Sequence, residues 1–500
     1  MGKDSLSLRN KTYKGFFWIG LSTFSSTLMK LITIAVLSRF LTPKEFGIVA
    51  ATQIIISFAE IFSTAGVGPA IIQKKEVSNK DISTGNLINV IFGGILFLIL
   101  FMLSSQISGF VNIENPIYLK ILSIIFLINS ISIVSESLVQ KEMDFRYIAN
   151  VNIISLTIYS IASIVLALLD FGVWSIIYAQ LLQSTIRSIS FLLKKPTLKK
   201  IDISLESAKN LSYFGLGFTL SRIFNNIANQ ADNFVVSKYL GTSALGYYSR
   251  SYQLLMLPTN ILGTIMDKVT FPLMSKLQTD NKKLGYIYTN FMLIYGVISL
   301  PIMLISIICS KELIHLFLGE RWDNVVLPFQ ILMGGLFFRV GYKISDTAVR
   351  ALGAVYKRLW VQVVYAIAVF TGALIGSQWG IVGVAISTTI AITLNYILMI
   401  ILIWKIIKFD YIYLFKNLFL LLSGLLLLLG TLMPILNKFI NFEIYNDFFN
   451  NLVEMFLKLT IILFFVILMY FTYYKLNQKN EFVQFILNQS KIKRKKKKVV

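Results

Sequence analysis

The sequence predicts an all-α polytopic membrane protein with about fourteen transmembrane helices in two related bundles. Composition is the first reason, because 56% of the 500 residues are hydrophobic and only 14% are charged, with a mean hydropathy of +0.72. A water-soluble protein of this length would carry more polar surface. The second reason is a series of apolar runs that are long enough to cross a bilayer as helices. The third is an internal repeat near residues 40 and 240.

The apolar runs are separated by short hinges that hold most of the charged residues. A helix needs roughly 20 residues to cross the hydrocarbon core. The run at 15–38 is too long for the apolar region of a signal peptide, and no A-x-A cleavage motif follows it, so we expect it to be the first span. The predicted spans are 15–38, 46–72, 84–111, 117–140, 147–169, 171–193, 211–239, 244–275, 284–310, 325–351, 357–377, 379–404, 412–436 and 451–474.

A stretch that closes the first predicted span occurs again at the end of the seventh. L-S-R-F-L-T-P-K-E-F-G (Leu37–Gly47) aligns without a gap with V-S-K-Y-L-G-T-S-A-L-G (Val236–Gly246). Such a repeat predicts two membrane bundles in tandem, and an even number of spans in each gives both copies one orientation. The matched positions are Ser38 with Ser237, Arg39 with Lys238, Phe40 with Tyr239, Leu41 with Leu240 and Gly47 with Gly246.

The repeat sets the predicted domain organisation. Residues 1–193 form an N-terminal six-helix lobe, and residues 211–404 form a pseudo-symmetric C-terminal six-helix lobe. A cytoplasmic linker at 194–210 joins them. Residues 405–474 add two helices that have no counterpart in the repeat, and residues 475–500 form a basic cytoplasmic tail.

The lysines and arginines predict the orientation. They concentrate in alternate hinges and at both ends of the chain, whereas the opposite hinges hold few of them. By the positive-inside rule, both termini are cytoplasmic. The net charge of +23 is spread over these hinges, so it indicates membrane topology rather than nucleic-acid binding. We interpret the cationic tail Lys491–Lys498 as a segment that rests on anionic membrane lipids.

Cysteine and histidine usage excludes several kinds of site. Cys309 is the only cysteine and His315 the only histidine, so an intrachain disulfide and a Cys/His zinc site are both excluded. The chain also lacks a G-x-x-x-x-G-K-[ST] phosphate-binding loop. We therefore expect no cofactor and no metal centre, and interpret His315 as structural.

Charged side chains inside the predicted spans indicate a hydrated interior. A charge at mid-bilayer costs roughly 2.5–3.5 kcal/mol, so such residues normally face protein or water. On the seventh span the polar residues recur at helical spacing, which predicts a wet cavity along that helix. The candidates for substrate binding are Lys30, Arg187, Arg222, Asn226, Asn229, Lys268, Arg339 and Lys343. The candidates for ion coupling are Glu60, Glu136, Asp232, Asp267 and Asp346.

These residue types suit particular chemistry, and each also has a plain packing role as its alternative. An excess of cations suits an anionic, phosphate-bearing substrate, and buried acids can load and release protons. Lys343 and Asp346, three residues apart, could instead neutralise each other, and Lys268 could extend to the cytoplasmic surface. The amides could simply join helices.

Several motifs carry a family resemblance. They are S-R-F-L-T-P-K-E-F-G-I-V-A (Ser38–Ala50), G-V-G-P-A-I-I-Q-K-K (Gly66–Lys75), N-Q-A-D-N-F-V-V-S-K-Y-L-G (Asn229–Gly241), A-L-G-Y-Y-S-R-S-Y-Q-L-L-M-L-P (Ala244–Pro258) and L-F-L-G-E-R-W (Leu316–Trp322). Together they resemble the bacterial polysaccharide-transporter family, the Wzx-type flippases of the MOP exporter superfamily. The likeness is greatest to the branch that exports colanic acid, teichuronic acid and related exopolysaccharides.

The resemblance implies a fold and a task. The fold would be MATE-like, with two six-helix lobes around a central cavity and two extra C-terminal helices. The task would be to move undecaprenyl-pyrophosphate-linked oligosaccharides across the bacterial cytoplasmic (inner) membrane by alternating access, for O-antigen, capsule or exopolysaccharide synthesis. A proton or sodium gradient would drive the step instead of ATP. A polysaccharide polymerase and a chain-length regulator would be further partners.

Three other functions compete with this interpretation. A multidrug exporter of the same superfamily would have the same bundle, although the motifs at 43–47 and 66–73 argue against it. A membrane-bound polymerase or glycosyltransferase would need paired carboxylates or a base in a sizeable outer loop, whereas the predicted outer loops are short. A scaffold for glycan-assembly enzymes would leave the polar stripe of the seventh span without a purpose. We therefore expect a transporter rather than an enzyme.

Overall fold

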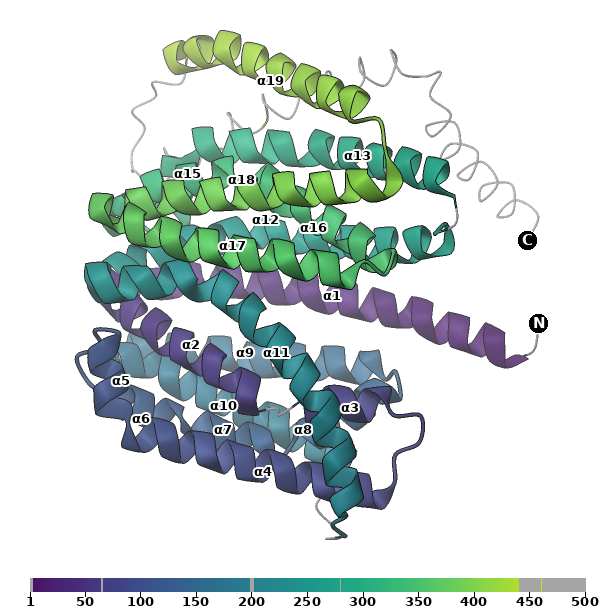
Figure 1. Ribbon diagram of the computed structural model, residues 1–500. Coiled ribbons are helices and arrows are strands. Elements are labelled where there is room, and N and C mark those ends of the chain that lie inside the picture. Colours follow the sequence, from purple (N-terminus) through teal and green to yellow (C-terminus); the bar gives the residue numbers. More distant parts are fainter. Residues whose placement is uncertain (1–2, 64–65, 198–201, 279, 440–459, 461–500) are drawn as a thin grey trace, which may run out of the picture.

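The computed structural model describes residues 3–63, 66–197, 202–278, 280–439 and 460. Some side chains inside the described helices, including those of Arg222 and Lys268, are outside the described part. Within these ranges every regular element is a helix (Figure 1). The predicted last span at 451–474 and the tail at 475–500 fall outside the described residues, apart from residue 460.

The first half of the chain forms ten helices in the described ranges. They are α1 (Lys3–Phe40), α2 (Pro43–Ser63), α3 (Val67–Gln73), α4 (Asn79–Met102), α5 (Ser104–Phe110), α6 (Ile117–Leu122), α7 (Ile124–Ser130), α8 (Ile133–Lys141), α9 (Phe145–Leu168) and α10 (Val173–Lys194).

The second half continues from α11, with short 3-10 or π-helical turns labelled η. The elements are α11 (Leu205–Val235), η1 (Val236–Leu240), α12 (Gly241–Lys276), α13 (Asn281–Ile308), α14 (Ser310–Phe317), η2 (Glu320–Val325), α15 (Val326–Gly334), α16 (Leu336–Ala351), α17 (Val355–Gly376), η3 (Ser377–Trp379), α18 (Gly380–Ile407) and α19 (Tyr411–Phe439).

Local sequence signals start several of these helices. The T-P-K-E sequence before α2 forms a capping box, in which the Thr42 amide donates to Glu45 Oε2 at 2.7 Å and the Glu45 amide donates to Thr42 Oγ1 at 3.3 Å. Pro43 occupies the first helical position, where its missing N–H costs nothing. Ser78 and Asp81 form the corresponding capping box of α4. Such caps satisfy amide groups that a helix leaves without partners.

Seven helical segments of the described part are long and apolar enough to cross a membrane, or nine if each of two bent pairs counts as one span. Large apolar side chains on the outer helices, such as Met102, Trp360 and Phe419, are 70–73% exposed. Exposed apolar surface on this scale is typical of contact with lipid. The chain is therefore a multi-pass membrane protein, and the exact number of spans stays a prediction.

Several predicted spans are not single straight helices. The run at 46–72 is divided into α2 and α3, because Gly66 before α3 has a left-handed backbone with φ of 67°. The run at 117–140 bends by 46° after α7, and that at 325–351 bends by 42° between α15 and α16. Hydropathy measures the length of an apolar run, and these breaks change its direction without changing its composition.

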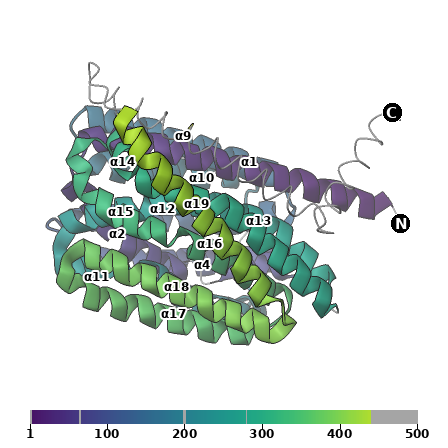
Figure 2. The same ribbon diagram turned by 90° about the horizontal axis from the view of Figure 1, so that it is seen from above.

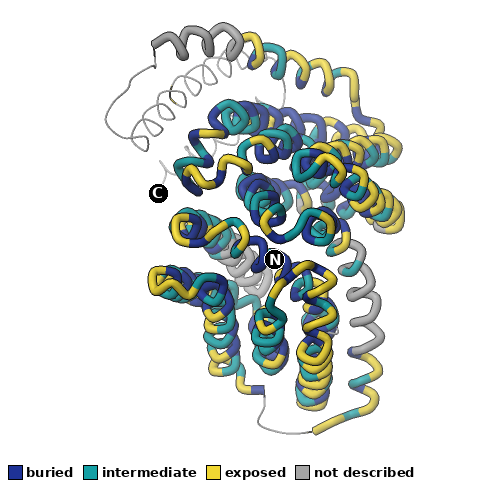
Figure 3. The backbone as a smooth tube through the Cα atoms, turned by 90° about the vertical axis from the view of Figure 1, so that its left-hand side faces the viewer, coloured by how far each residue is buried: buried dark blue, intermediate teal, exposed yellow. Residues whose placement is uncertain are grey.

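The helices lie in two groups, and α11 connects them (Figure 1). The N-terminal part of α11 contacts α3 and α4 of the first half, and the helix also contacts α17 of the second half. The other main contact between the halves is the crossing of α2 with α12. Buried residues lie where helices face one another, and exposed residues lie on the outer sides (Figure 3). Figure 2 shows α19 lying across the outside of the second-half helices.

Candidate functional site

A large cavity of about 1330 Å³ lies mainly among the first-half helices. Side chains from α1, α2, α3, α7, α8, α9 and α10 line it, and α11 and α12 supply the wall toward the second half. Its residues on α2 run from Phe46 to Ser63, so the cavity begins beside the α2–α12 crossing and extends along the helix. Its lining residues Lys30, Gln53 and Glu60 are exposed, so the cavity is not sealed.

Five charged residues of the described part line the cavity. The three cations are Lys30, Arg187 and Arg250, and the two acids are Glu60 and Glu136. Arg187 on α10 and Glu136 on α8 form an ion pair with a 2.5 Å N–O distance. The structure thus brings together the four charged residues that the sequence predicted from the first half, and adds Arg250.

Amide side chains supply most of the other polar groups on the wall. Such groups donate and accept hydrogen bonds at once, which suits the hydroxyl groups of sugars. Ser184 donates to the side-chain oxygen of Asn129 at the wall, so part of this surface is already ordered. The lining amides are Gln53, Gln73, Asn129, Gln140, Gln180, Gln183, Gln230, Asn233 and Gln253.

Arg250 is the functional candidate that sequence reasoning missed. The structure places it on α12, with its guanidinium carbon 4.5 Å from the ring centre of Phe46 on α2. Its buried Nε has no hydrogen-bond partner among the described residues. A signal was present, because Gln253 follows three residues later and therefore lies on the same helical face.

Asp232 and Arg339 do not line the cavity formed by the described residues, so the structure does not bring them together with the first-half candidates. Asp232 is 1% exposed and accepts a hydrogen bond from the Tyr248 hydroxyl at 2.8 Å. Arg339 is 2% exposed and donates to the hydroxyls of Tyr252 and Tyr365 inside the second half. Neighbouring positions on a helix differ by about 100° in direction. Asn233 therefore faces the cavity, and Asp232 faces the second-half interior.

Asp267 and Asp346 belong to a different cluster, formed with arginines of the second half. Arg350 reaches Asp267 Oδ1 at 2.6 Å and Asp346 Oδ2 at 3.1 Å. Arg358 also pairs with Asp346. The alternative in which Lys343 neutralises Asp346 is therefore not the arrangement found, because the arginines occupy both carboxylate oxygens. The Lys343 side chain instead passes beside Gly263 on α12.

The remaining candidates lie on α11 and α12. Asn226 donates to the Ser57 carbonyl on α2 at 3.3 Å, which joins the halves as an interhelical hydrogen bond. Asn229 also has an interaction partner, and neither residue is on the described wall of the cavity. The Arg222 and Lys268 side chains lie outside the described part, so their predicted roles stay predictions.

Comparisons with known proteins support the family resemblance that the sequence motifs indicate. A family model described as "Polysaccharide biosynthesis protein" matches residues 36–327. The lipopolysaccharide biosynthesis protein WzxC of Escherichia coli (strain K12) is 27% identical over 351 residues, which cover 68% of this chain and 70% of WzxC. The teichuronic acid biosynthesis protein TuaB of Bacillus subtilis (strain 168) is 24% identical over 385 residues, which cover 75% of this chain and 80% of TuaB.

Two kinds of solved structure share the fold. The lipid II flippase MurJ in an inward closed conformation matches with a TM-score of 0.73 and 15% identity, over 90% of this chain and 98% of MurJ. An inward-facing multidrug resistance MATE transporter of the MOP superfamily matches with a TM-score of 0.64 and 18% identity, over 79% of this chain and 99% of that protein. At these identities the matches establish the fold alone.

Proposed function

Because the chain belongs to the polysaccharide biosynthesis protein family, we propose that it moves lipid-linked oligosaccharides across the bacterial cytoplasmic membrane. The observation that carries this proposal is the cavity of about 1330 Å³, lined by three cations and many amides. A lipid-linked oligosaccharide has an anionic phosphate group and sugars that carry many hydroxyl groups. A wall that combines cations with amides offers hydrogen bonds to both parts.

The cations of the wall would hold the pyrophosphate group. Lys30, Arg187 and Arg250 all line the cavity, and a guanidinium can form two parallel hydrogen bonds with a phosphate. The amides would hold the sugars, while Glu60 and Glu136 would take up the coupling proton or sodium ion. Asp232, Asp267 and Asp346 are weaker candidates for coupling, because they do not line the described wall of this cavity.

Transport would require all of the predicted transmembrane helices. Fourteen spans would form two six-helix lobes and two further helices, with both termini in the cytoplasm. The cavity would open alternately to the two sides as the lobes move. No step in this cycle makes or breaks a covalent bond, so we propose a transporter without catalytic residues. A polymerase and a chain-length regulator would act on the product outside.

The test is deletion of the gene, followed by mass spectrometry of undecaprenyl-linked glycans. We expect one such glycan to accumulate on the inner leaflet and to disappear when the wild-type gene is restored. A variant with Lys30→Gln, Arg187→Gln and Arg250→Gln together should fail to restore export. Arg146→Gln is the matched control, since Arg146 is an exposed arginine outside this cavity.

The same strains separate this function from drug export. Normal glycan levels in the deletion strain, together with raised accumulation of cationic dyes, would overturn the proposal in favour of a multidrug exporter.

A further inference from the structure

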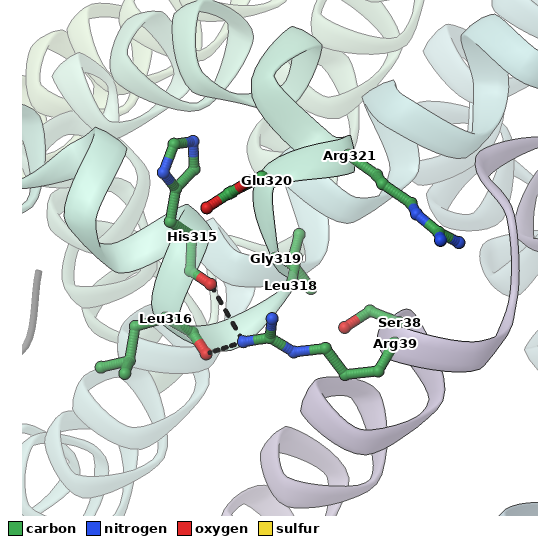
Figure 4. Close-up of a pocket in the computed structure, with 8 residues that line it drawn as sticks. All are labelled: Ser38, Arg39, His315, Leu316, Leu318, Gly319, Glu320 and Arg321. Atoms are coloured by element: carbon green, nitrogen blue, oxygen red, sulfur yellow. Dashed lines mark hydrogen bonds between the residues drawn. The ribbon is translucent and has the colours of Figure 1, made fainter. Parts of the chain in front are cut away.

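One end of the cavity is closed by hydrogen bonds between the two halves, beginning at the end of α1. The Ser38 hydroxyl shares its one hydrogen between the Ala35 carbonyl of its own helix at 2.9 Å and the Phe317 carbonyl of the other half at 3.2 Å. Trp322 Nε1 donates to the Ser38 carbonyl at 3.1 Å. Arg39 Nη2 donates to the carbonyls of His315 at 3.1 Å and Leu316 at 2.9 Å (Figure 4). Figure 4 shows Ser38, Arg39, His315 and Leu316 around a small pocket of about 390 Å³.

The same exchange occurs a second time, at the matching position of the repeat. The Ser237 hydroxyl donates to the Val111 carbonyl at 2.7 Å. Asn112 Nδ2 donates to the carbonyls of Ser237 and Lys238, both at 2.8 Å. In each case a serine donates to a loop of the opposite half, and a side-chain N–H of that loop donates to the carbonyl of the serine. We call the pairs Ser38–Trp322 and Ser237–Asn112 the double latch.

Three of the four residues of the double latch are buried, and Asn112 is exposed. Ser38 is 2% exposed, and both Ser237 and Trp322 are fully buried. A buried donor or acceptor that loses its partner also loses access to water, so breaking one such bond is unfavourable unless the whole surface opens. The two halves therefore separate at this end by releasing both pairs in one movement.

A line of side-chain contacts joins the first latch to the cavity. The Arg250 guanidinium lies over the Phe46 ring at 4.5 Å. The Phe46 ring meets the Trp322 ring edge-on with 5.4 Å between centres, and Trp322 donates to Ser38. Members of this line come alternately from the second and the first half, so displacement of Arg250 alters a contact between the halves.

We propose that the double latch is the outward gate, which closes the cavity toward the outer side of the membrane. Arg250 is its positioning residue, because an anion that binds Arg250 in the cavity releases the latch. A phosphate competes with the Phe46 ring for the guanidinium, because charge-assisted hydrogen bonds are stronger than a cation–π contact. Arg250 then leaves Phe46, and Phe46 no longer supports Trp322 against Ser38. This inference rests on the proposed function, because it requires an anionic substrate in the cavity.

The test measures a distance across the gate with spin labels at Phe40→Cys and Tyr239→Cys. These matched positions belong to different halves and are 45% and 61% exposed. Replacing Cys309, the single native cysteine, with Ala leaves only the two labels. The full-length protein in lipid nanodiscs is measured alone, with undecaprenyl pyrophosphate, and with uncharged undecaprenol. Retention of radiolabelled ligand confirms that each sample is occupied.

The parent protein should gain a longer distance with undecaprenyl pyrophosphate and should not change with undecaprenol. Trp322→Phe combined with Asn112→Asp, which removes the side-chain N–H donors of both pairs, should show the longer distance without ligand. At full occupancy, Arg250→Gln should lose the ligand-induced change. The control Arg146→Gln, at an exposed arginine that lines neither pocket, should keep it. An Arg250→Gln protein that still responds to the bound ligand would overturn the role of Arg250.

The remaining outcomes separate the inference from the proposed function. A parent protein that binds the ligand without any change of distance would overturn the gate and leave the function standing. A parent protein that retains neither lipid would instead contradict the proposed function. Arg250→Lys, which keeps a positive charge in a smaller group, guards against misfolding of the Gln variant and should keep part of the response.

Discussion

Gly47 on α2 and Gly246 on α12 face each other where the two halves cross, with no room for a side chain on either. A Cβ atom on Gly47 would lie 1.7 Å from the Thr242 carbonyl oxygen, and one on Gly246 would lie 1.8 Å from the Pro43 carbonyl oxygen. The contacts are reciprocal because the two glycines occupy matching positions of the repeat. The obstructing atoms belong to the backbone, so only separation of the helices could make room.

Gly47→Ala should therefore hold the gate away from its closed position. Overpacking of a tight contact costs about 1–3 kcal/mol, which corresponds to a shift of roughly 5- to 150-fold in a two-state equilibrium. We expect the Phe40–Tyr239 label distance to lengthen without ligand and glycan export to fall at least several-fold. Gly94→Ala is the control, since no atom lies within 4 Å of a Cβ there. Equal behaviour of the two variants would show that the crossing does not need glycine.

Tyr248→Phe should destabilise the second half through Asp232. The Tyr248 hydroxyl donates to Asp232 Oδ2 at 2.8 Å, and both residues are at most 1% exposed. Loss of a partner from a buried polar group costs about 1–3 kcal/mol. Thermal unfolding in detergent should show this loss of stability. When Tyr248→Phe is made together with Asp232→Asn, the additional loss caused by Tyr248→Phe should be smaller. Tyr239→Phe, at an exposed tyrosine, should leave stability unchanged. Strict additivity in the double variant would exclude the coupling.

Asp81→Asn should loosen the start of α4. The Asp81 carboxylate accepts from Lys74 Nζ at 2.6 Å and from the Ser78 amide at 2.9 Å, and it is 1% exposed. Loss of a helix cap costs about 0.5–2 kcal/mol, and the ion pair is lost with it. We expect a lower unfolding temperature and faster protease cleavage near residues 74–81. Glu76→Gln, at an exposed acid in the same turn, should be neutral. Identical cleavage of both variants would argue against the cap.

The sequence predicted much of the fold, because its strongest signals are local. Apolar runs identified the membrane helices, and T-P-K-E before α2 is a capping box that can be recognised by eye. The repeat paired Gly47 with Gly246 and Ser38 with Ser237, and the structure uses all four at the junction of the halves. Sequence alone could not show that matching positions of the two copies meet at this junction.

The candidate site was predictable only in part. Lys30, Glu60, Glu136 and Arg187 are on the cavity wall, although their roles remain proposals. The polar residues of the second half could not be placed, because a helix such as α11 has two different neighbours. Helical spacing shows which residues share a face, but it does not show whether that face meets a cavity or a packed interior.

Glu136→Gln should change ligand binding without changing stability, because the ion pair that it removes lies on the cavity wall. The Arg187 and Glu136 side chains are 40% and 31% exposed, and such pairs contribute only about 0–1 kcal/mol to stability. The unfolding temperature should therefore change little. The freed Arg187 guanidinium should bind undecaprenyl pyrophosphate several-fold more tightly, and Arg187→Gln should weaken binding by a similar factor.

The matched control is Glu142→Gln, which removes the ion pair with Lys195 away from the cavity wall. Both acid-to-amide changes alter the net charge equally, so a long-range effect would raise affinity in both. A local effect raises it only in Glu136→Gln, because Arg187 alone gains hydrogen-bond donors that face the ligand. Equal affinities for the two variants would mean that Arg187 does not contact the phosphate, and its ion pair would then be structural.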